Sequence, residues 1–235
     1  MRFPVATVIV HCPRCHSDEI YRHGRSTSRH ERFRCRLCKR VFQLTYTYEA
    51  RKPGVKEQIV DMAHSGSGVR DTARTLKIGI NTVIRTFKKL SPRRITSSPV
   101  AHADVALICE LDEQWSFVGS KAVQHWLWYA YNTKTGGVLA STFGLRNDET
   151  CRELLALLTP FNTGMITSDD WGSYGREVPK EKHLTGQIFT QRIERNNLTL
   201  RTRIKRLARK TICFSRSIEV HEKVIRSFIE KYMFY

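Results

Sequence analysis

Two pairs of cysteines have the spacing of a metal site. Cys12-Pro-Arg-Cys15 and Cys35-Arg-Leu-Cys38 are C-x-x-C turns with 19 residues between them. Each turn can aim two thiolates at one ion, and two turns complete the tetrahedral site of zinc, with Zn–S distances of about 2.3 Å. The sequence therefore predicts a zinc ribbon in which Cys12, Cys15, Cys35 and Cys38 hold a structural Zn²⁺.

Carboxylates gather at three places in the C-terminal half of the chain. Three carboxylates can hold two Mg²⁺ ions (or Mn²⁺) about 4 Å apart, which activate an attacking oxygen and stabilise the leaving oxygen at a phosphodiester. The acids are Glu110, Asp112 and Glu113 in one apolar run, Asp169 and Asp170 after a second, and Glu194 within a basic run.

The elements around these acids follow one order. Residues 106–118, 125–131 and 138–143 are predicted strands, residues 147–159 a helix capped by Asn147, and residues 165–167 a short strand. A long helix is expected from about Thr190 through the basic run that follows. Strand, strand, strand, helix, strand and helix is the order of a ribonuclease-H-like fold, which brings such acids to one place. Period-two geometry puts Glu110 and Asp112 on one face of the first strand and Glu113 on the other.

The N-terminal half is predicted to form two small modules. Short strands are expected at residues 7–10, 33–35 and 41–48, around the cysteine turns. Helices are expected at residues 55–65, 69–77 and 81–90, with the spacing of a helix-turn-helix. Arg85 and Lys88 lie on the outward side of the third helix, where they would contact DNA. The usual turn glycine of the motif is replaced by Lys77.

The fold class is therefore a multidomain α+β protein, in which a zinc ribbon and a helix-turn-helix precede an α/β ribonuclease-H-like domain. The predicted boundaries are 1–52 for the ribbon, 53–90 for the helix-turn-helix, 91–103 for a linker rich in Pro, Ser and Thr, and 104–235 for the last domain. The final segment, 218–235, is amphipathic and is expected to close the core, with a dimer contact as the alternative.

Composition points to a polyanionic partner. The 235 residues carry 40 Lys and Arg against 22 Asp and Glu, a formal net charge of +18, which is typical of nucleic-acid binding. No apolar stretch near the start is long enough for a signal peptide or a membrane span, so a cytoplasmic protein without a membrane partner is expected. In that compartment disulfides are rare, and Cys109, Cys151 and Cys213 are predicted to be buried as small hydrophobic residues.

The basic run after residue 190 is predicted to line a helix with one apolar face and one cationic face. Ile193, Leu200, Ile204 and Leu207 form the apolar stripe. The cationic residues expected to contact DNA phosphates are Arg192, Arg195, Arg203, Lys205 and Arg206.

Three runs, Leu111–Trp115, Ser168–Tyr174 and Thr190–Arg201, resemble those of the IS-one family of bacterial insertion-sequence transposases, as do the paired cysteine turns and the helix-turn-helix. In that family the second Asp and the Glu of a DDE triad are separated by 24 residues. Asp169 and Glu194 have that separation, whereas Asp170 would leave 23. The resemblance thus implies a catalytic triad of Asp112, Asp169 and Glu194.

The same resemblance implies a role for Arg201. DDE enzymes often carry a basic residue seven places after the Glu, and Arg201 lies there. Seven residues turn a helix by about 700° and advance it by about 10 Å, so Arg201 returns to the face of Glu194 and can reach a flanking phosphate. Trp171 and Tyr174 also match the family; packing near the site is the expected role, and stacking on a base is the alternative.

The implied function is a DNA transposase. It would bind the terminal inverted repeats of its element, cleave the 3′ ends with Mg²⁺ and join them to target DNA, as a homo-oligomer on the bacterial nucleoid. A DNA-binding regulator with an inactive nuclease-like domain is the alternative. A tyrosine recombinase is disfavoured because its His-x-x-Arg string occurs here only as His11–Arg14, within a cysteine turn.

Overall fold

The computed structural model describes residues 9–27, 29–44, 49–97, 106–186, 188, 190–208 and 215–234. The chain divides into two compact units, Met1–Glu49 and Ala50–Tyr235. No helix in the described ranges is both long and apolar enough to cross a membrane.

The first unit contains a small antiparallel sheet in the order β1-β2-β3. Its strands are β1 (Ile20–Arg25), β2 (Glu31–Cys35) and β3 (Val41–Phe42). The strand predicted at 33–35 is confirmed within β2, but β1 was missed because Arg and His interrupt its apolar pattern. Of the strand predicted at 7–10, Ile9 and Val10 are not in a strand, and residues 7–8 lie outside the described residues. The strand predicted at 41–48 ends at Phe42, and residues 45–48 lie outside the described residues.

A short 3-10 helix, η1 (Glu49–Arg51), spans the boundary between the units, and the three predicted helices follow it and form a helix-turn-helix. They are α1 (Val55–His64), α2 (Val69–Thr75) and α3 (Ile80–Lys89). Ile59, Val83 and Phe87 are fully or almost fully buried between them. Lys77, which replaces the usual turn glycine, takes a left-handed φ of 53°. The turn therefore keeps its geometry, at the steric cost that a side chain meets in this conformation.

A five-stranded mixed sheet follows, in the order β6-β5-β4-β7-β8. The first three strands are antiparallel, and β7 and β8 add in parallel on the other side of β4. The strands are β4 (Leu107–Val118), β5 (Ser120–Asn132), β6 (Gly137–Gly144), β7 (Thr163–Ser168) and β8 (His183–Thr185). The order and directions are those of the predicted ribonuclease-H-like fold.

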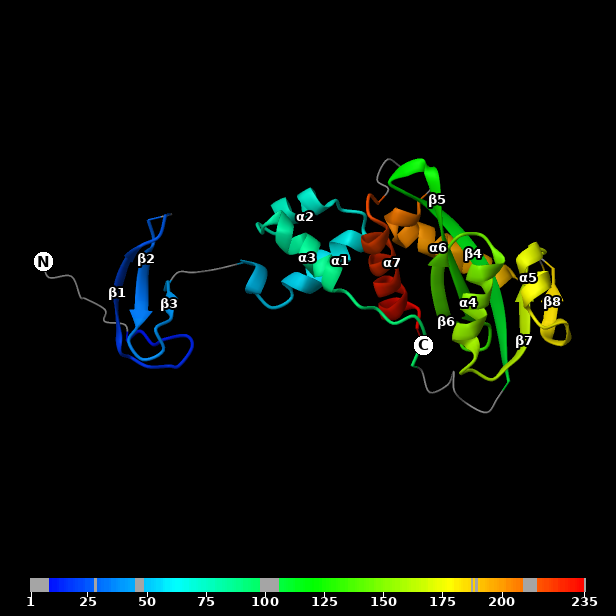
Figure 1. The fold of residues 1–235 in the computed structure, drawn as a ribbon, viewed down its shortest axis with the longest axis horizontal. Coiled ribbons are helices and arrows are strands. Elements are labelled where there is room, and N and C mark those ends of the chain that lie inside the picture. Colours follow the sequence, from blue (N-terminus) through cyan, green and yellow to red (C-terminus); the bar gives the residue numbers. More distant parts are fainter. Residues whose placement is uncertain are drawn as a thin grey trace, which may run out of the picture. The chain divides into compact units, whose positions relative to one another are not determined.

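Helices cover both faces of this sheet (Figure 1). On one face, α4 (Asp148–Leu158) and α5 (Gly172–Glu177) enclose a core that contains Trp128, Cys109 and Cys151. On the other, α6 (Gln191–Arg203) and α7 (Ile218–Tyr232) pack over Leu127 and Tyr129. Burial of Cys109 and Cys151 is as predicted, whereas Cys213 lies outside the described residues. The remaining elements are the 3-10 turns η3 (Lys180–Lys182) and η5 (Lys205–Leu207).

The long basic helix ends earlier than predicted. Helix α6 stops at Arg203, and Ile204 has φ −104° and ψ 96°, outside helical geometry. Ile204 and Leu207 are nevertheless fully buried in the core below the sheet. The apolar residues at the end of the predicted stripe are therefore buried by a turn and not by a longer helix. The periodicity of the sequence could not distinguish these two structures.

Part of the predicted linker is packed instead of free. Ile95 forms an isolated antiparallel bridge with Ala140 of β6. The Thr96 amide donates to Leu139, and the Ser141 amide donates to Arg94. Residues 94–96 thus occupy the edge of β6, and residues 98–103 lie outside the described part of the chain.

Helix α7 completes the core of the helix-turn-helix as well as that of the sheet (Figure 1). Val224 is fully buried among Val55, Ile59 and Phe87. At the same junction His64 shares a hydrogen bond with Ser227, and the Lys231 ammonium lies 2.9 Å from Asp61. The core role predicted for the C-terminal segment therefore extends to the DNA-binding helices.

This junction gives a stability prediction. Val224→Asp would bury an unpaired charge and is expected to lower the free energy of unfolding by about 3–5 kcal/mol, as measured by urea denaturation. Ile218→Asp, on the same helix but 50% exposed, is the control and should change stability little. Equal stability of Val224→Asp and wild type would show that α7 does not support the helix-turn-helix in solution.

Candidate active site and metal centre

The four predicted zinc ligands meet in the first unit. The Sγ atoms of Cys12 and Cys38 are 3.5 Å apart, those of Cys15 and Cys35 are 3.6 Å apart, and all four lie within 4.8 Å of one another. A tetrahedron with Zn–S bonds of about 2.3 Å needs S···S separations near 3.8 Å. The donor set and its spacing therefore fit one Zn²⁺.

Backbone geometry shapes both cysteine turns in the same way. His16 directly follows Cys15 with φ 56°, and Lys39 directly follows Cys38 with φ 59°. The His16 amide donates back to the carbonyl of Cys12, which closes the first turn. Each turn thus contains one residue in the unfavourable left-handed conformation, and bonds to the metal can offset this cost.

The third helix of the helix-turn-helix presents the residues predicted to read DNA. The side chains of Arg85 and Lys88 are exposed on α3. Lys88 lies at the end nearest α7, because its carbonyl accepts a hydrogen bond from Lys223. Near the other end, Ile80 and Asn81 are exposed, and it is the N-terminal residues of a recognition helix that usually contact base edges. These two residues carry no charge and were missed by a search for basic residues.

The predicted acids line one cavity in the second unit. Asp112 comes from β4, Asp169 from the turn after β7, and Glu194 from the first turn of α6, around a space of about 490 Å³. Arg201, two turns further along α6, lines the same cavity. Asp170 is exposed and does not line it. Among the described residues, only the four thiols bring three or more ligand atoms within 4.8 Å of one another, so the three acids do not all lie that close to each other.

The Asp112 carboxylate is largely withdrawn from solvent. Burial, with repulsion from Glu113 and Asp169, raises the pKa of Asp112 to about 7. One carboxylate oxygen accepts the Glu113 amide at 2.8 Å, and the other accepts the side-chain amide of Asn197. A carboxylate crowded by like charge in this way is a site where a cation is favoured.

Asn197 was not identified from the sequence. It is buried on the face of α6 that meets the sheet, and its side-chain oxygen accepts a 2.9 Å hydrogen bond from the Tyr129 hydroxyl. The carbonyl oxygen of Ile193 lies 3.1 Å from the same hydroxyl and shares its one proton. The amide of Asn197 is thereby fixed in the orientation that donates to Asp112. One signal was visible in advance, since Asn197 lies three residues after Glu194 on the same helix.

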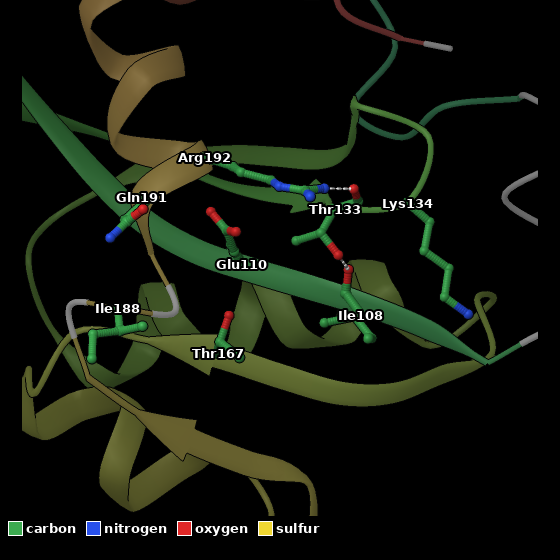
Figure 2. Close-up of a pocket in the computed structure, with 8 residues that line it drawn as sticks. All are labelled: Ile108, Glu110, Thr133, Lys134, Thr167, Ile188, Gln191 and Arg192. Atoms are coloured by element: carbon green, nitrogen blue, oxygen red, sulfur yellow. Dashed lines mark hydrogen bonds between the residues drawn. The ribbon is translucent and has the colours of Figure 1, made fainter.

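Glu110 has a different role from Asp112, although both lie on the same face of β4. Its carboxylate accepts a 2.6 Å hydrogen bond from the backbone amide of Ile193, at the start of α6. Figure 2 shows Glu110 pointing toward this first turn, beside Gln191 and Arg192, within a cavity of about 600 Å³. Burial raises the pKa of Glu110. It anchors the helix N-terminus that carries Glu194.

Glu113, on the opposite face, is paired. It accepts a 2.7 Å hydrogen bond from the Tyr174 hydroxyl and forms a 2.6 Å ion pair with Arg146. Tyr174 is fully buried and packs edge-on against Trp128, so packing is its observed role. Trp171 lies under the Arg146 guanidinium at 3.7 Å. The split of Glu113 from Glu110 and Asp112 follows the predicted period of two.

The basic residues predicted to contact DNA differ in accessibility. Arg192, Arg195, Arg203 and Lys205 are exposed, although Arg192 donates to the carbonyl of Thr133 (Figure 2). Arg206 was expected on the same cationic strip. The structure instead buries most of its side chain, which donates to Ser215 at 2.7 Å, and burial lowers its pKa. The early end of α6 turns Arg206 inward.

Comparison with known families covers almost the whole chain. Residues 106–235 match the family described as IS1 transposase, residues 46–91 the InsA C-terminal domain, and residues 5–39 the InsA N-terminal domain. The first match spans more than half of the chain and carries the DDE domain.

Individual relatives each match one part of the chain. The Insertion element iso-IS1n protein InsB of Shigella dysenteriae is 89% identical over 131 residues, which are 56% of this chain and all of that protein. Iso-IS1N protein InsA of the same species is 71% identical over 84 residues, 36% of this chain and 93% of that protein. IS1 9 protein InsB of Escherichia coli K12 is 41% identical over 144 residues, 61% of this chain and 86% of that protein. The chain joins an InsA-like half to an InsB-like half and belongs to the IS1 transposase family, as a DDE-type DNA transposase.

Proposed function

We propose that this transposase hydrolyses the phosphodiesters at the 3′ ends of its insertion element and then joins the freed 3′-hydroxyls to target DNA. The observation that carries the proposal is the single cavity lined by Asp112, Asp169, Glu194 and Arg201. Both steps are in-line displacements at phosphorus, so one site can serve both.

Asp112, Asp169 and Glu194 would hold Mg²⁺, or Mn²⁺, in this cavity. Oxygen-only ligands suit these ions, and the like charges of Glu113 and Asp169 beside the buried Asp112 carboxylate favour a cation there. When bound, the metal activates the attacking oxygen and stabilises the leaving oxygen. Asp112, on the central strand of the sheet, would hold the metal together with the other two acids.

The surrounding residues position these acids and the DNA. Asn197 holds the Asp112 carboxylate, and Glu110 anchors the start of α6, on which Glu194 lies. Arg201 would contact a phosphate flanking the one that is cleaved. Water in the first step and a 3′-hydroxyl in the second are the nucleophiles, so no covalent protein–DNA intermediate is needed.

Recognition of the element ends is assigned to the N-terminal modules, with the boundaries 1–52 for the ribbon and 53–90 for the helix-turn-helix. Arg85 and Lys88 would contact the terminal inverted repeats. The exposed cations of domain 104–235, Arg192, Arg195, Arg203 and Lys205, would hold DNA phosphates without sequence preference. A homo-oligomer would pair the two ends on the bacterial nucleoid.

Strand cleavage on a duplex that carries a terminal inverted repeat and its flanking DNA tests the proposal. We expect a Mg²⁺-dependent nick that leaves a 3′-hydroxyl at the element end, followed by joined products with target DNA. Specific binding without a nick would instead support a regulator with an inactive nuclease-like domain. A phosphotyrosine link to DNA would contradict the mechanism.

Arg201→Ala is expected to slow cleavage by about 10–100-fold, because one charge-assisted contact to phosphate contributes about 1.5–3 kcal/mol. Single-turnover cleavage at saturating protein measures this. Arg203→Ala, exposed on the same helix, is the control and should change DNA affinity but not the saturated rate. An unchanged rate for Arg201→Ala would remove this residue from the site.

A further inference from the structure

An aromatic row contributes Trp115, Trp126 and Arg146 to one wall of the acidic cavity and continues beyond it at both ends. Trp115 on β4 stands directly opposite Trp126 on β5, and their ring centres are 6.5 Å apart. Phe117 continues the row, 5.1 Å from Trp115. At the other end the Arg146 guanidinium lies between two indoles, 4.9 Å from Trp126 and 3.7 Å from Trp171. We call Trp115, Phe117, Trp126, Arg146 and Trp171 the aromatic row.

The row differs from the core of the same domain. Trp128, the neighbour of Trp126 two residues along β5, is fully buried under α4. Trp115, Phe117 and Trp126 are only half-buried. On the opposite face of the same strands, Gln114 and Ser116 are buried beneath the C-terminal segment, where Ser116 bonds His221. The two strands are therefore covered on one side and partly open on the aromatic side.

The open side is continuous with the acids. Trp115, Trp126 and Arg146 line the same cavity as Asp112 and Asp169. Its volume of about 490 Å³ lies in the range of pockets that hold small organic ligands, about 300–1,000 Å³. If the acids hold a phosphate of a DNA strand, the nucleotide next to that phosphate would therefore lie over the indoles of Trp115 and Trp126.

A paired base cannot use such a surface. Inside a duplex the faces of each base are covered by its stacked neighbours, and only the edges are accessible in the grooves. Aromatic side chains, with an interleaved arginine plane, bind bases that are unpaired. The protein's net charge of +18 matches a polyanion, which makes a nucleotide a better occupant of this wall than an apolar peptide.

We infer that Trp115 and Trp126 form a stacking site for an unpaired nucleobase next to the cleaved phosphate. The inference rests on the proposed function, because it takes the acidic cavity as the place where the phosphate is held. Arg146 supports the indole planes and is itself held by Glu113. The site would favour DNA ends that open easily at the cleavage point.

Cleavage of two matched substrates tests the inference. One duplex is fully paired at the element end, and the other carries mismatches at the nucleotides that flank the cleaved phosphate. Trp115→Ala and Trp126→Ala are expected to slow cleavage of the paired duplex by about tenfold or more, since stacking on an aromatic side chain is sequence-tolerant and strong. The mismatched duplex should restore both variants to within about threefold of wild type, and Trp115→Phe should retain most activity on both duplexes.

A structural role would give a different result. If the indoles only support the fold, both duplexes are cleaved equally slowly by the alanine variants, and the inference is overturned. Tyr232→Ala is the control, because Tyr232 is a partly exposed ring on α7 that does not line the cavity. Its ratio of rates on the two duplexes should equal that of wild type.

A second measurement does not depend on cleavage. In the Asp112→Asn protein, 5-iodouracil placed in turn at each nucleotide near the cleavage point should photocrosslink to a peptide containing Trp115 or Trp126. Crosslinks elsewhere, with none in this peptide at any position, would overturn the inference even if wild type cleaves DNA. If wild type cleaves no DNA but the crosslink forms, the proposed function fails and the stacking site stands.

Discussion

In metal-free buffer at pH 8, the Asp112→Asn protein is expected to melt at a higher temperature than wild type, and with Mg²⁺ added it is expected to cleave no DNA. Burial and the neighbouring acids raise the pKa of Asp112 from 3.8 to about 7. The protonated carboxyl stabilises the folded state at low pH, and this stability is lost as pH rises from about 4 through 7. At pH 8 the ionised Asp112 carboxylate therefore destabilises the folded state, and the neutral side chain of Asn removes this destabilisation.

The size of this effect has a clear upper limit. A shift of about 3 pKa units corresponds to about 4 kcal/mol at about 1.4 kcal/mol per unit. The two carboxylate oxygens of Asp112 accept hydrogen bonds from the Glu113 amide and from Asn197, whereas Asn has only one acceptor oxygen. Loss of one of these hydrogen bonds is expected to offset about 1–3 kcal/mol of the gain in stability. The net gain is expected to be about 1–3 kcal/mol, which raises the melting temperature by several degrees in a chain of this size.

Scanning calorimetry with and without Mg²⁺ measures the change in stability, and strand cleavage of an element-end duplex in Mg²⁺ measures the loss of activity. Wild type should gain stability from Mg²⁺, because the ion supplies the compensating charge, and Asp112→Asn should not. At pH 5 the difference between the two proteins should shrink. An Asp112→Asn protein that melts below wild type and gains equally from Mg²⁺ would show that Asp112 is an ordinary structural carboxylate.

Loss of one zinc ligand is expected to unfold the first unit and leave the second folded. Among the described residues from 9 to 44, only Cys12 and Cys35 are buried, so the ribbon has almost no core without its metal. Structural zinc contributes about 10–16 kcal/mol in such small domains. Cys38→Ser should therefore release Zn²⁺ and expose residues 9–44 to hydrogen exchange. The cores of the Ala50–Tyr235 unit, which do not include the ribbon, should remain protected.

Cys109→Ala is the matched control for this experiment. Cys109 is fully buried under α4 and far in sequence from the four ligands, so the variant should keep one Zn²⁺ per chain and lose only a little stability. Full zinc content in Cys38→Ser, or unfolding of both units together, would contradict the role assigned to the ribbon.

Much of the fold followed from local patterns. The helix-turn-helix, the succession of strands and helices along the chain and the cap at Asn147, which accepts from the Thr150 amide, could be predicted because each depends on short-range periodicity or capping. The end of α6 could not, since Ile204 and Leu207 continue the apolar stripe whether or not the helix continues. The junction at Val224 also escaped prediction, because its partners lie more than a hundred residues earlier in the chain.

The site was predictable in its acids but not in their supports. Spacing and resemblance selected Asp112, Asp169 and Glu194, which line one cavity. Asn197 and Arg146 act through contacts with residues distant in sequence, Tyr129 and Glu113, and an isolated Asn or Arg has no signature. Arg206 was selected by its basic neighbours but is not exposed, because the backbone changes direction after α6 and places its side chain against Ser215.

The most direct test of the assigned cavity compares two adjacent aspartates. Asp169 lines the cavity with Asp112 and Glu194, whereas Asp170 is exposed and lies outside it. Single-turnover cleavage of an element-end duplex in Mg²⁺ should fall by about a thousandfold or more in Asp169→Asn and remain within about threefold of wild type in Asp170→Asn. Loss of cleavage in Asp170→Asn with activity retained in Asp169→Asn would contradict the assignment of this cavity as the site of strand cleavage.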